Sequence, residues 1–296
     1  MLFMRTSDGL DLQYRESGRG PAVLFSHEFG GSHASWDKQV ERLSTAHRCI
    51  VYTARGFRPS TISDDAMRYG RQEAARDIVE LAEHLQLERF HLVGAGMGAV
   101  TTLLAAALLG DKVKTVTLLG CLAGPLSRLD SFDHHSRIRR ALLALAQDDR
   151  TAAHAALCGQ QHYERLIREK AAWWHRYRSV WEQHSATGLA LTLERVEWDI
   201  PDVNGLARRL KRIEAPVLLV AGSEEHPAVH STNACLSRIL PSARLVKLPN
   251  CGGLAHVEQP AVFNKLLWQH VRNFELRENG HKHYSKLELS LNLEAS

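Results

Sequence analysis

The sequence contains no long apolar run and no stretch that resembles a targeting signal. No segment approaches the roughly 18 consecutive apolar residues that a membrane-spanning helix requires. The first residues, Met1 to Thr6, lack the charged and apolar regions of a signal peptide. We therefore expect a cytoplasmic protein that has no membrane partner.

Paired-cysteine motifs are also absent. The five cysteines are odd in number and form no C-x-x-C pair, which argues against a disulfide framework. His281 and His283 are potential metal ligands, but no third ligand lies near them in the sequence. We expect reduced thiols, no metal and no cofactor.

The chain has neither a block of like charge nor an internal repeat. Its net charge of +4 comes from basic residues interspersed with acids, so we expect no nucleic-acid partner. Arg137, Arg139 and Arg140 are interpreted as the solvated face of a helix. With 44% hydrophobic and 24% charged residues, the 296 residues suit one large domain or a core with an insertion. The sequence does not indicate the oligomeric state.

The sequence does contain an alternation of strand-like and helical segments. Short apolar runs recur along the chain, and Gln72 to Leu85 carries apolar residues at helical spacing. This alternation predicts an α/β fold with a mostly parallel sheet. The expected strands are Leu2–Arg5, Leu10–Glu16, Ala22–Ser26, Cys49–Tyr52, the run that begins at Phe90, Val113–Leu119, Pro216–Ala221 and Arg244–Leu248.

One long segment, residues 122–206, interrupts the alternation. It is rich in helix-forming residues and holds four of the six tryptophans. We predict that it forms a helical cap on a core made of residues 1–121 and 207–274. Residues 275–296 follow the last expected helix, Val262 to Asn273, and are interpreted as a charged tail.

Three aromatic residues of the expected cap share one helix face. Trp173, Tyr177 and Trp181 repeat at four-residue spacing. Such a stripe either packs the cap against the core or forms an aromatic roof over a ligand pocket. We predict packing for at least one ring and ligand contact for the others.

The most informative stretch runs from Phe90 to Val100. It reads as a buried strand, a tight turn of alternate glycines and a buried helix. Strand, tight turn and helix form the context of the nucleophile elbow G-x-S-x-G. Here the frame is Gly94-Ala95-Gly96-Met97-Gly98, so Gly96 stands where the motif has serine.

The same glycines also fit the dinucleotide fingerprint G-x-G-x-x-G/A. That motif normally follows the first strand of its unit and has an acid about 20 residues further on. Here four strand-like runs come first, and the next strand ends in Gly120-Cys121 without an acid. A nucleotide site is therefore the weaker interpretation.

Several motifs together resemble the α/β-hydrolase superfamily, and in particular its single-domain enzymes with a helical cap. They are His27-x-Phe29-Gly30-Gly31 with Trp36, Arg55-Gly56, Gly94-x-x-x-Gly98, Pro216 to Gly222 and Leu254 to Pro260. The resemblance covers roughly residues 2–274. It implies a mostly parallel eight-stranded sheet, flanked by helices and carrying the cap.

The resemblance also assigns the catalytic positions by motif. The nucleophile position is Gly96, and the acid position is Glu225, where the family usually has aspartate. The histidine position, which directly follows a glycine, is Gly253. His256 does not match the catalytic base and is interpreted as a core residue or a partner of Glu258.

Glycine at two triad positions is incompatible with a serine ester mechanism, which needs an activated hydroxyl and a base. The residues that remain as tentative catalytic groups are Glu28, which replaces the usual glycine of the oxyanion loop, His27 and Glu225. Glu28 is alternatively solvent-directed or paired with Arg55. The expected oxyanion-type backbone groups are those of Phe29 and Met97. The expected ligand-binding side chains are Trp173, Tyr177, Trp181 and Cys251.

Three functions follow from this pattern. The first is an enzyme that uses non-covalent acid–base chemistry of lyase, isomerase or hydration type. The second is a pseudoenzyme that binds a ligand or a partner. The third is a weak hydrolase that uses a bound water. In each case we expect a small hydrophobic ligand under the cap.

Overall fold

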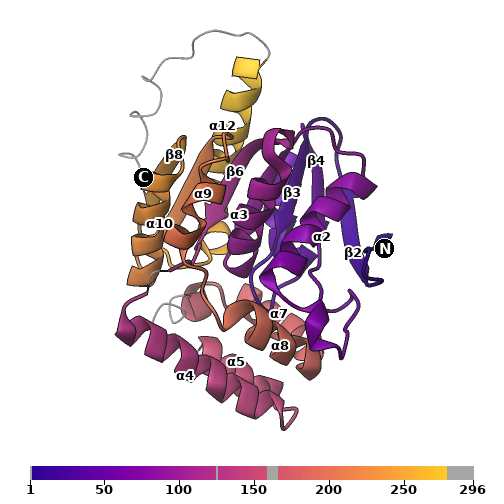
Figure 1. Cartoon of the computed structure of the whole chain (residues 1–296), viewed down its shortest axis with the longest axis vertical. Coiled ribbons are helices and arrows are strands. Elements are labelled where there is room, and N and C mark those ends of the chain that lie inside the picture. The colour runs from indigo at the N-terminus through magenta and orange to yellow at the C-terminus, as the bar shows by residue number, and fades with distance from the viewer. Residues whose placement is uncertain (1, 125, 159–165, 279–296) are drawn as a thin grey trace.

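The computed structural model describes residues 2–124, 126–158 and 166–278. Its centre is one eight-stranded sheet with strand order β1-β2-β4-β3-β5-β6-β7-β8 (Figure 1). β1 pairs with β2 and β2 with β4 antiparallel, and all other neighbours are parallel, which confirms the expected fold class. The strands are β1 (Leu2–Arg5), β2 (Asp11–Ser17), β3 (Ala22–Ser26), β4 (Arg48–Tyr52), β5 (Phe90–Ala95), β6 (Val113–Leu119), β7 (Val217–Gly222) and β8 (Ala243–Leu248).

Helices cover both faces of the sheet because each parallel strand must be followed by a crossover. One face carries α2 (Arg71–His84), α3 (Met97–Leu109), α9 (Val203–Leu210) and α10 (Pro227–Ile239). The other face carries α1 (Asp37–Leu43), α11 (Ala255–Glu258) and α12 (Pro260–Glu278). Short helical turns lie at η1 (His33–Trp36), η2 (Ala66–Arg68) and η3 (Gly110–Lys112). The inner strands β3, β5 and β7 are buried at every residue, as expected for strands covered on both faces.

A separate helical layer covers the carboxyl ends of the parallel strands (Figure 1). It consists of α4 (Arg128–Leu145), α5 (Arg150–Cys158), α7 (Ala171–Gln183), α8 (Ala186–Thr192) and the π-helical turn η4 (Leu193–Glu197). These helices fall within the segment expected to form the cap. In open α/β sheets, ligands bind at the carboxyl ends of the strands, so this layer lies over the expected place for a site.

The last helix is longer than expected. α12 runs to Glu278 and so includes Glu275, which the sequence analysis assigned to the tail. The Glu275 carboxylate lies 3.4 Å from His47 Nε2 and 3.5 Å from His91 Nε2. Glu278 forms ion pairs with Arg89 and Lys114. These partners come from distant parts of the chain and extend the helix over the amino ends of the strands. His281 and His283 lie outside the described residues.

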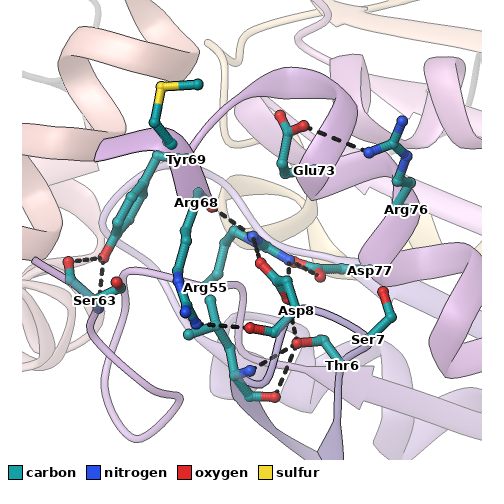
Figure 2. A network of polar contacts seen from close by, with 12 residues as sticks. Thr6, Ser7, Asp8, Arg55, Ser63, Arg68, Tyr69, Glu73, Arg76 and Asp77 are labelled. Carbon is teal, nitrogen blue, oxygen red and sulfur yellow. Dashed lines mark hydrogen bonds and ion pairs between the residues drawn. The ribbon is translucent and has the colours of Figure 1, made fainter. Parts of the chain in front are cut away.

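A buried ion cluster fixes the loop that follows β4 (Figure 2). Arg55 donates to Asp77 at 2.7 and 2.5 Å, to Asp8 at 2.9 Å and to the Arg68 carbonyl at 2.5 Å. The guanidinium is therefore fully engaged away from Glu28, and the expected alternative of a Glu28–Arg55 pair is wrong.

The five cysteines all lie in the described part of the chain and form no disulfide, and four of them are buried. Among the described residues, no helix is both long enough and apolar enough to cross a membrane.

Candidate active site

A cavity of about 230 Å³ lies between the helical layer and the carboxyl ends of the strands. Five residues that follow strands line it, namely Glu28 after β3, Gly96 after β5, Gly120 after β6, Glu225 after β7 and Gly253 after β8. Parallel strands bring these residues together because their carboxyl ends share one edge of the sheet. Three of the five are glycines, so the cavity floor carries few side chains.

Gly96 lies at the tip of the turn between β5 and α3. Its φ of 54° and ψ of −120° place it in a region that favours glycine. A Cβ on Gly98 would collide with the backbone carbonyls of Ser26 and His27, so the helix is packed tightly behind the turn. A Cβ on Gly96 would lie 3.3 Å from Glu28 Cβ and would point into less crowded space. The elbow geometry is thus present, with a glycine at its tip.

Glu225 lies beside Gly253 in the cavity wall. A Cβ on Gly253 would lie 2.8 Å from Glu225 Oε2 and 3.0 Å from Oε1. The carboxyl group therefore occupies space that a side chain at position 253 would need. Oε1 accepts a hydrogen bond from the His226 backbone at 3.2 Å, while Oε2 is buried and has no partner among the described residues. Burial raises the pKa of Glu225 to about 7.

Glu28 lines the same cavity, but its carboxyl group is turned toward the protein interior. Oε1 accepts a hydrogen bond from Ser35 Oγ at 2.8 Å, and Oε2 lies 3.9 Å from His256 Nε2. No carboxyl atom lies within 4 Å of the position of a Cβ on Gly96. Burial raises the pKa of Glu28 to about 7.

His256 is a core residue, as one of the two sequence interpretations held. It is fully buried, and its ring lies 4.7 Å from that of Trp36. Neither ring nitrogen has a hydrogen-bond partner among the described residues. Burial lowers its pKa to about 3, so the imidazole is neutral. Its approach to Glu28 was not predictable, because spacing from a motif does not reveal which way a short helix points.

His27 holds the loop together rather than facing the cavity. Its Nδ1 lies 2.7 Å from the Glu28 carbonyl, and its Nε2 accepts a hydrogen bond from the Ala54 backbone at 3.0 Å. The second bond requires the proton on Nδ1, which then donates to the carbonyl. Burial lowers the pKa of His27 to about 3. Both ring nitrogens are engaged, so His27 has none left for a substrate.

Phe29 and Met97, the residues expected to supply oxyanion-type backbone groups, both line the cavity. Met97 is the first residue of α3, and the first N–H groups of a helix have no acceptor within it. The helix dipole adds positive potential at this point. A helix N-terminus at the edge of a cavity favours negative charge there.

The three aromatic residues of α7 are placed differently. Tyr177 lines the cavity and donates a hydrogen bond to the Phe29 carbonyl at 2.9 Å. Trp173 stacks on Tyr177 and lines a separate surface depression. Trp181 is fully buried, donates to the Arg150 carbonyl at 2.8 Å and lies outside the cavity lining. Of the three rings, that of Tyr177 is the one that lines this cavity, and Trp181 packs the helix against Phe29.

Cys251 is fully buried behind the cavity and its thiol lies 3.7 Å from the Leu248 carbonyl. It is absent from the cavity lining, which differs from its expected role as a ligand contact. Among the described residues, no group of three His, Cys, Asp or Glu side chains is arranged to hold a metal ion.

The upper wall of the cavity is formed by α2, α4 and η4. Its polar residues were not predicted from the sequence. Arg71 of α2, His134 and Arg137 of α4, and Glu197 of η4 all line the cavity. Arg137 was interpreted as part of a solvated helix face together with Arg139 and Arg140, but only the other two are exposed. The spacing of His134, Arg137 and Ile138 along one helix face was the available signal.

Comparison with known proteins gives a consistent result. The sequence profile of the family described as "alpha/beta hydrolase fold" matches residues 21–260. A Variovorax paradoxus protein named "Putative carbamate hydrolase RutD" is 30% identical, over 84% of this chain and 90% of that protein. A Bacillus subtilis protein named "Putative 2-succinyl-6-hydroxy-2,4-cyclohexadiene-1-carboxylate synthase" is 26% identical, over 88% of this chain and 94% of that protein. The solved structure of a hydrolase from Pseudomonas aeruginosa PA01 matches with a TM-score of 0.79 and 25% identity, over 91% of this chain and 97% of that one.

Proposed function

Because the chain belongs to the α/β-hydrolase fold family, we propose that it is an enzyme that acts on a small carbonyl compound by general acid–base catalysis, without a covalent ester intermediate. The observation that carries the proposal is the position of Glu225. Its carboxyl group lies in the cavity wall, in space that a side chain at position 253 would need, and its Oε2 has no partner among the described residues.

The absence of a covalent intermediate follows from the two glycines. Gly96 has no hydroxyl to attack a carbonyl, and Gly253 has no imidazole to take a proton. No serine or threonine is among the residues that line the described part of the cavity, and burial raises the pKa of the Cys158 thiol, which does line it, to about 12. A thiol with such a pKa stays protonated and is a poor nucleophile.

Glu225 has the properties of a proton-transfer group. A carboxyl group with a pKa of about 7 exchanges its proton readily near neutral pH, where both of its forms are populated. Its unpartnered oxygen can remove a proton from a water molecule that attacks a carbonyl carbon. It can equally remove a proton from a carbon next to a carbonyl group. Both reactions develop negative charge on the carbonyl oxygen.

The floor of the cavity supports the stabilisation of that charge. The Met97 N–H at the start of α3 and the Phe29 backbone lie on the lining beside Gly96. Glu28 would oppose an oxyanion if its charge faced Gly96. Its carboxyl group is instead directed to Ser35 and His256, which relieves that conflict and gives Glu28 a positioning role in the loop.

Two relatives support this range of chemistry, since one carries the name of a hydrolase and the other that of a synthase. The competing function is a pseudoenzyme that binds its ligand without converting it, which the two glycines also favour. The decisive difference is turnover that depends on Glu225.

The test is a screen of small esters, lactones, enol esters and β-hydroxy acids, with product analysis by mass spectrometry. For any substrate found, Glu225→Gln should lower kcat by on the order of 100-fold or more, as expected for a lost general base. Glu224→Gln, which alters an exposed neighbour, is the matched control and should retain the activity. Full activity of Glu225→Gln would contradict the assignment, and binding without turnover across the panel would favour the pseudoenzyme.

A further inference from the structure

The upper wall of the cavity differs from its floor in carrying charge. Arg71 and Arg137 reach it from α2 and α4, on either side of His134. His134 Nε2 donates to the Glu197 carbonyl at 2.8 Å, which ties α4 to η4. Burial lowers the pKa of His134, so this residue is neutral and the positive charge of the wall comes from the two arginines.

Arg71 has no hydrogen bond or ion pair with any described residue. Glu197 and Asp199 act on it only through longer-range attraction, because neither carboxylate lies within 4.0 Å of the guanidinium. Arg71 is also the first residue of α2, where the helix dipole already supplies positive potential. Glu73, the acid of the first turn, lies 3.7 Å from Arg76 and does not line the cavity. The Arg71 guanidinium therefore has no direct partner among the described residues, and the two acids offset its charge only at longer range.

Arg137 is only partly engaged. Its Nη2 lies 3.3 Å from Asp133, an exposed residue one turn away on α4. Asp130 lies on the same helix as Arg137 and also lines the cavity. It accepts a hydrogen bond from Ser127 Oγ at 2.6 Å and lies 3.8 Å from His226. Asp130 thus faces the other side of the cavity mouth. The Arg137 guanidinium still has donors for a ligand.

The backbone that carries Arg71 is held in place independently of any ligand. Arg55 binds the Arg68 carbonyl, and Tyr69 Oη donates to the Ser63 carbonyl at 3.0 Å (Figure 2). These bonds fix Arg68 and Tyr69, and the first of them joins the cluster of Asp8, Arg55 and Asp77. Binding an anion then orders the Arg71 side chain but not the loop before it, which limits the entropic cost.

We propose that Arg71 and Arg137 bind a carboxylate group of the ligand, so that the cavity takes a small carboxylic acid with an apolar body. This inference deepens the proposed function. It rests on that function for the assumption that the other end of the ligand carries the reacting carbonyl group. The carboxylate would lie against the upper wall, and the carbonyl end would lie over Gly96 beside Glu225. Apolar residues between the two ends, among them Met97, Val100 and Ile138, match the apolar body. Arginine suits this role because its planar fork matches the geometry of a carboxylate.

Calorimetric titration with paired probes separates charge recognition from catalysis. Benzoate and hexanoate are compared with benzamide and hexanamide, which have similar shape but no charge. The wild-type protein and Glu225→Gln should both bind at least one carboxylate about tenfold or more tightly than its amide. Arg71→Gln should abolish that preference while leaving the affinity for the amide unchanged. Arg140→Gln, an exposed arginine of the same helix as Arg137, is the control and should keep the preference.

The failures of the two proposals are distinguishable. Loss of turnover with retained carboxylate preference in Glu225→Gln supports this inference, whatever the reaction. Equal affinity of wild-type protein for carboxylates and amides would overturn it. So would a loss of affinity for both probe classes in folded Arg71→Gln, because that result would show that Arg71 only balances Glu197. If Arg71→Gln does not fold, Arg137→Gln provides the same comparison, and an undiminished preference in Arg137→Gln would then count against the inference.

Discussion

Two glycines decide the chemistry at the scale of single residues. Gly96 and Gly253 occupy the tip of the elbow and the place beside Glu225, and neither has a side chain that can react. In a serine triad the nucleophile and the base act as one unit, so a variant that regains one of them gains little. The pair of positions therefore offers a direct test of the proposed mechanism.

Restoring both residues should create esterase activity that neither restoration gives alone. Gly96→Ser adds a hydroxyl at a backbone conformation that costs about 1–3 kcal/mol for a residue with a Cβ. Gly253→His adds a base that must displace the Glu225 oxygens, which lie 2.8 and 3.0 Å from the new Cβ. The measurement is hydrolysis of an aryl ester, with labelling by a fluorophosphonate as a second readout.

We expect no burst of product release from the aryl ester for either single variant and a weak burst for the double variant. The wild-type protein should stay unlabelled by the fluorophosphonate. A burst from Gly96→Ser alone would mean that a residue other than position 253 already serves as the base. The assignment of Gly253 to the position of the catalytic histidine would then be wrong.

Motif spacing placed these glycines and Glu225 after strands of the sheet, and all three line the cavity because strand ends in a parallel sheet converge on one edge. It could not locate Arg71, Arg137 or the contact between Glu28 and His256. Those depend on the direction in which a helix face or a side chain points after packing. A carboxylate in the oxyanion loop suggested catalysis, whereas Ser35 turns its oxygens away from Gly96.

At the scale of elements, one close approach joins the helical layer to the core. Gly30 lies directly beneath the ring of Trp181, and a Cβ there would collide with Cε3 and Cζ3. Gly30 also has a φ of 75°. The loop after β3 and helix α7 can pack this closely only because the residue between them has no side chain.

Gly30→Ala should therefore destabilise the protein more than backbone strain alone. Gly110→Ala is the matched control, since Gly110 also has a positive φ, of 58°, but has nothing within 4 Å of a Cβ. We expect strain alone to cost about 1–2 kcal/mol in Gly110→Ala and Gly30→Ala to cost about 1–3 kcal/mol more from overpacking. Urea unfolding measures both. Equal losses in the two variants would refute the close packing, whereas a partial recovery in Gly30→Ala with Trp181→Leu would support it.

The strands were predictable because buried parallel strands are short apolar runs between turn signals. The end of α12 was not, because Glu275 and Glu278 look like tail residues until His47, His91, Arg89 and Lys114 come together in space. The aromatic stripe on α7 showed a shared helix face, but the curvature of the core divides that face between Phe29, the cavity and solvent.

At the scale of the whole molecule, two buried carboxyl groups should give stability opposite dependences on pH. Burial would raise the pKa of Glu275, but hydrogen bonds and charge from His47 and His91 outweigh it and hold the pKa at about 2. The contribution of Glu275 is therefore present above pH 4.5 and is lost as the pH falls toward 2. The contribution of Glu28, whose pKa burial raises to about 7, is fully present below pH 4.5 and is lost as the pH rises from 4.5 through 7.

Unfolding in urea between pH 4.5 and pH 8 should separate these effects. Glu275→Gln should be less stable than the wild type throughout, by on the order of 1–3 kcal/mol at pH 7. Glu28→Gln should gain on the wild type by on the order of 3 kcal/mol as the pH rises from 4.5 to 8. His256, which lies beside Glu28, has a pKa of about 3 and stays neutral throughout this range, so its titration does not enter the Glu28 comparison. A difference between Glu28→Gln and wild type that does not change with pH would place the Glu28 carboxylate in water.

The distribution of the five thiols has a separate consequence for following motion in solution. Cys235 is half-exposed, Cys158 lies in a small apolar cluster under the helical layer, and Cys49, Cys121 and Cys251 are buried around the sheet. A disulfide exchange reagent should therefore consume them in three kinetic phases. The first reports the accessible surface, the second each opening of the layer above the cavity, and the third complete unfolding of the sheet. If a bound molecule slows the second phase, the reaction rate of the Cys158 thiol reports whether the site is occupied.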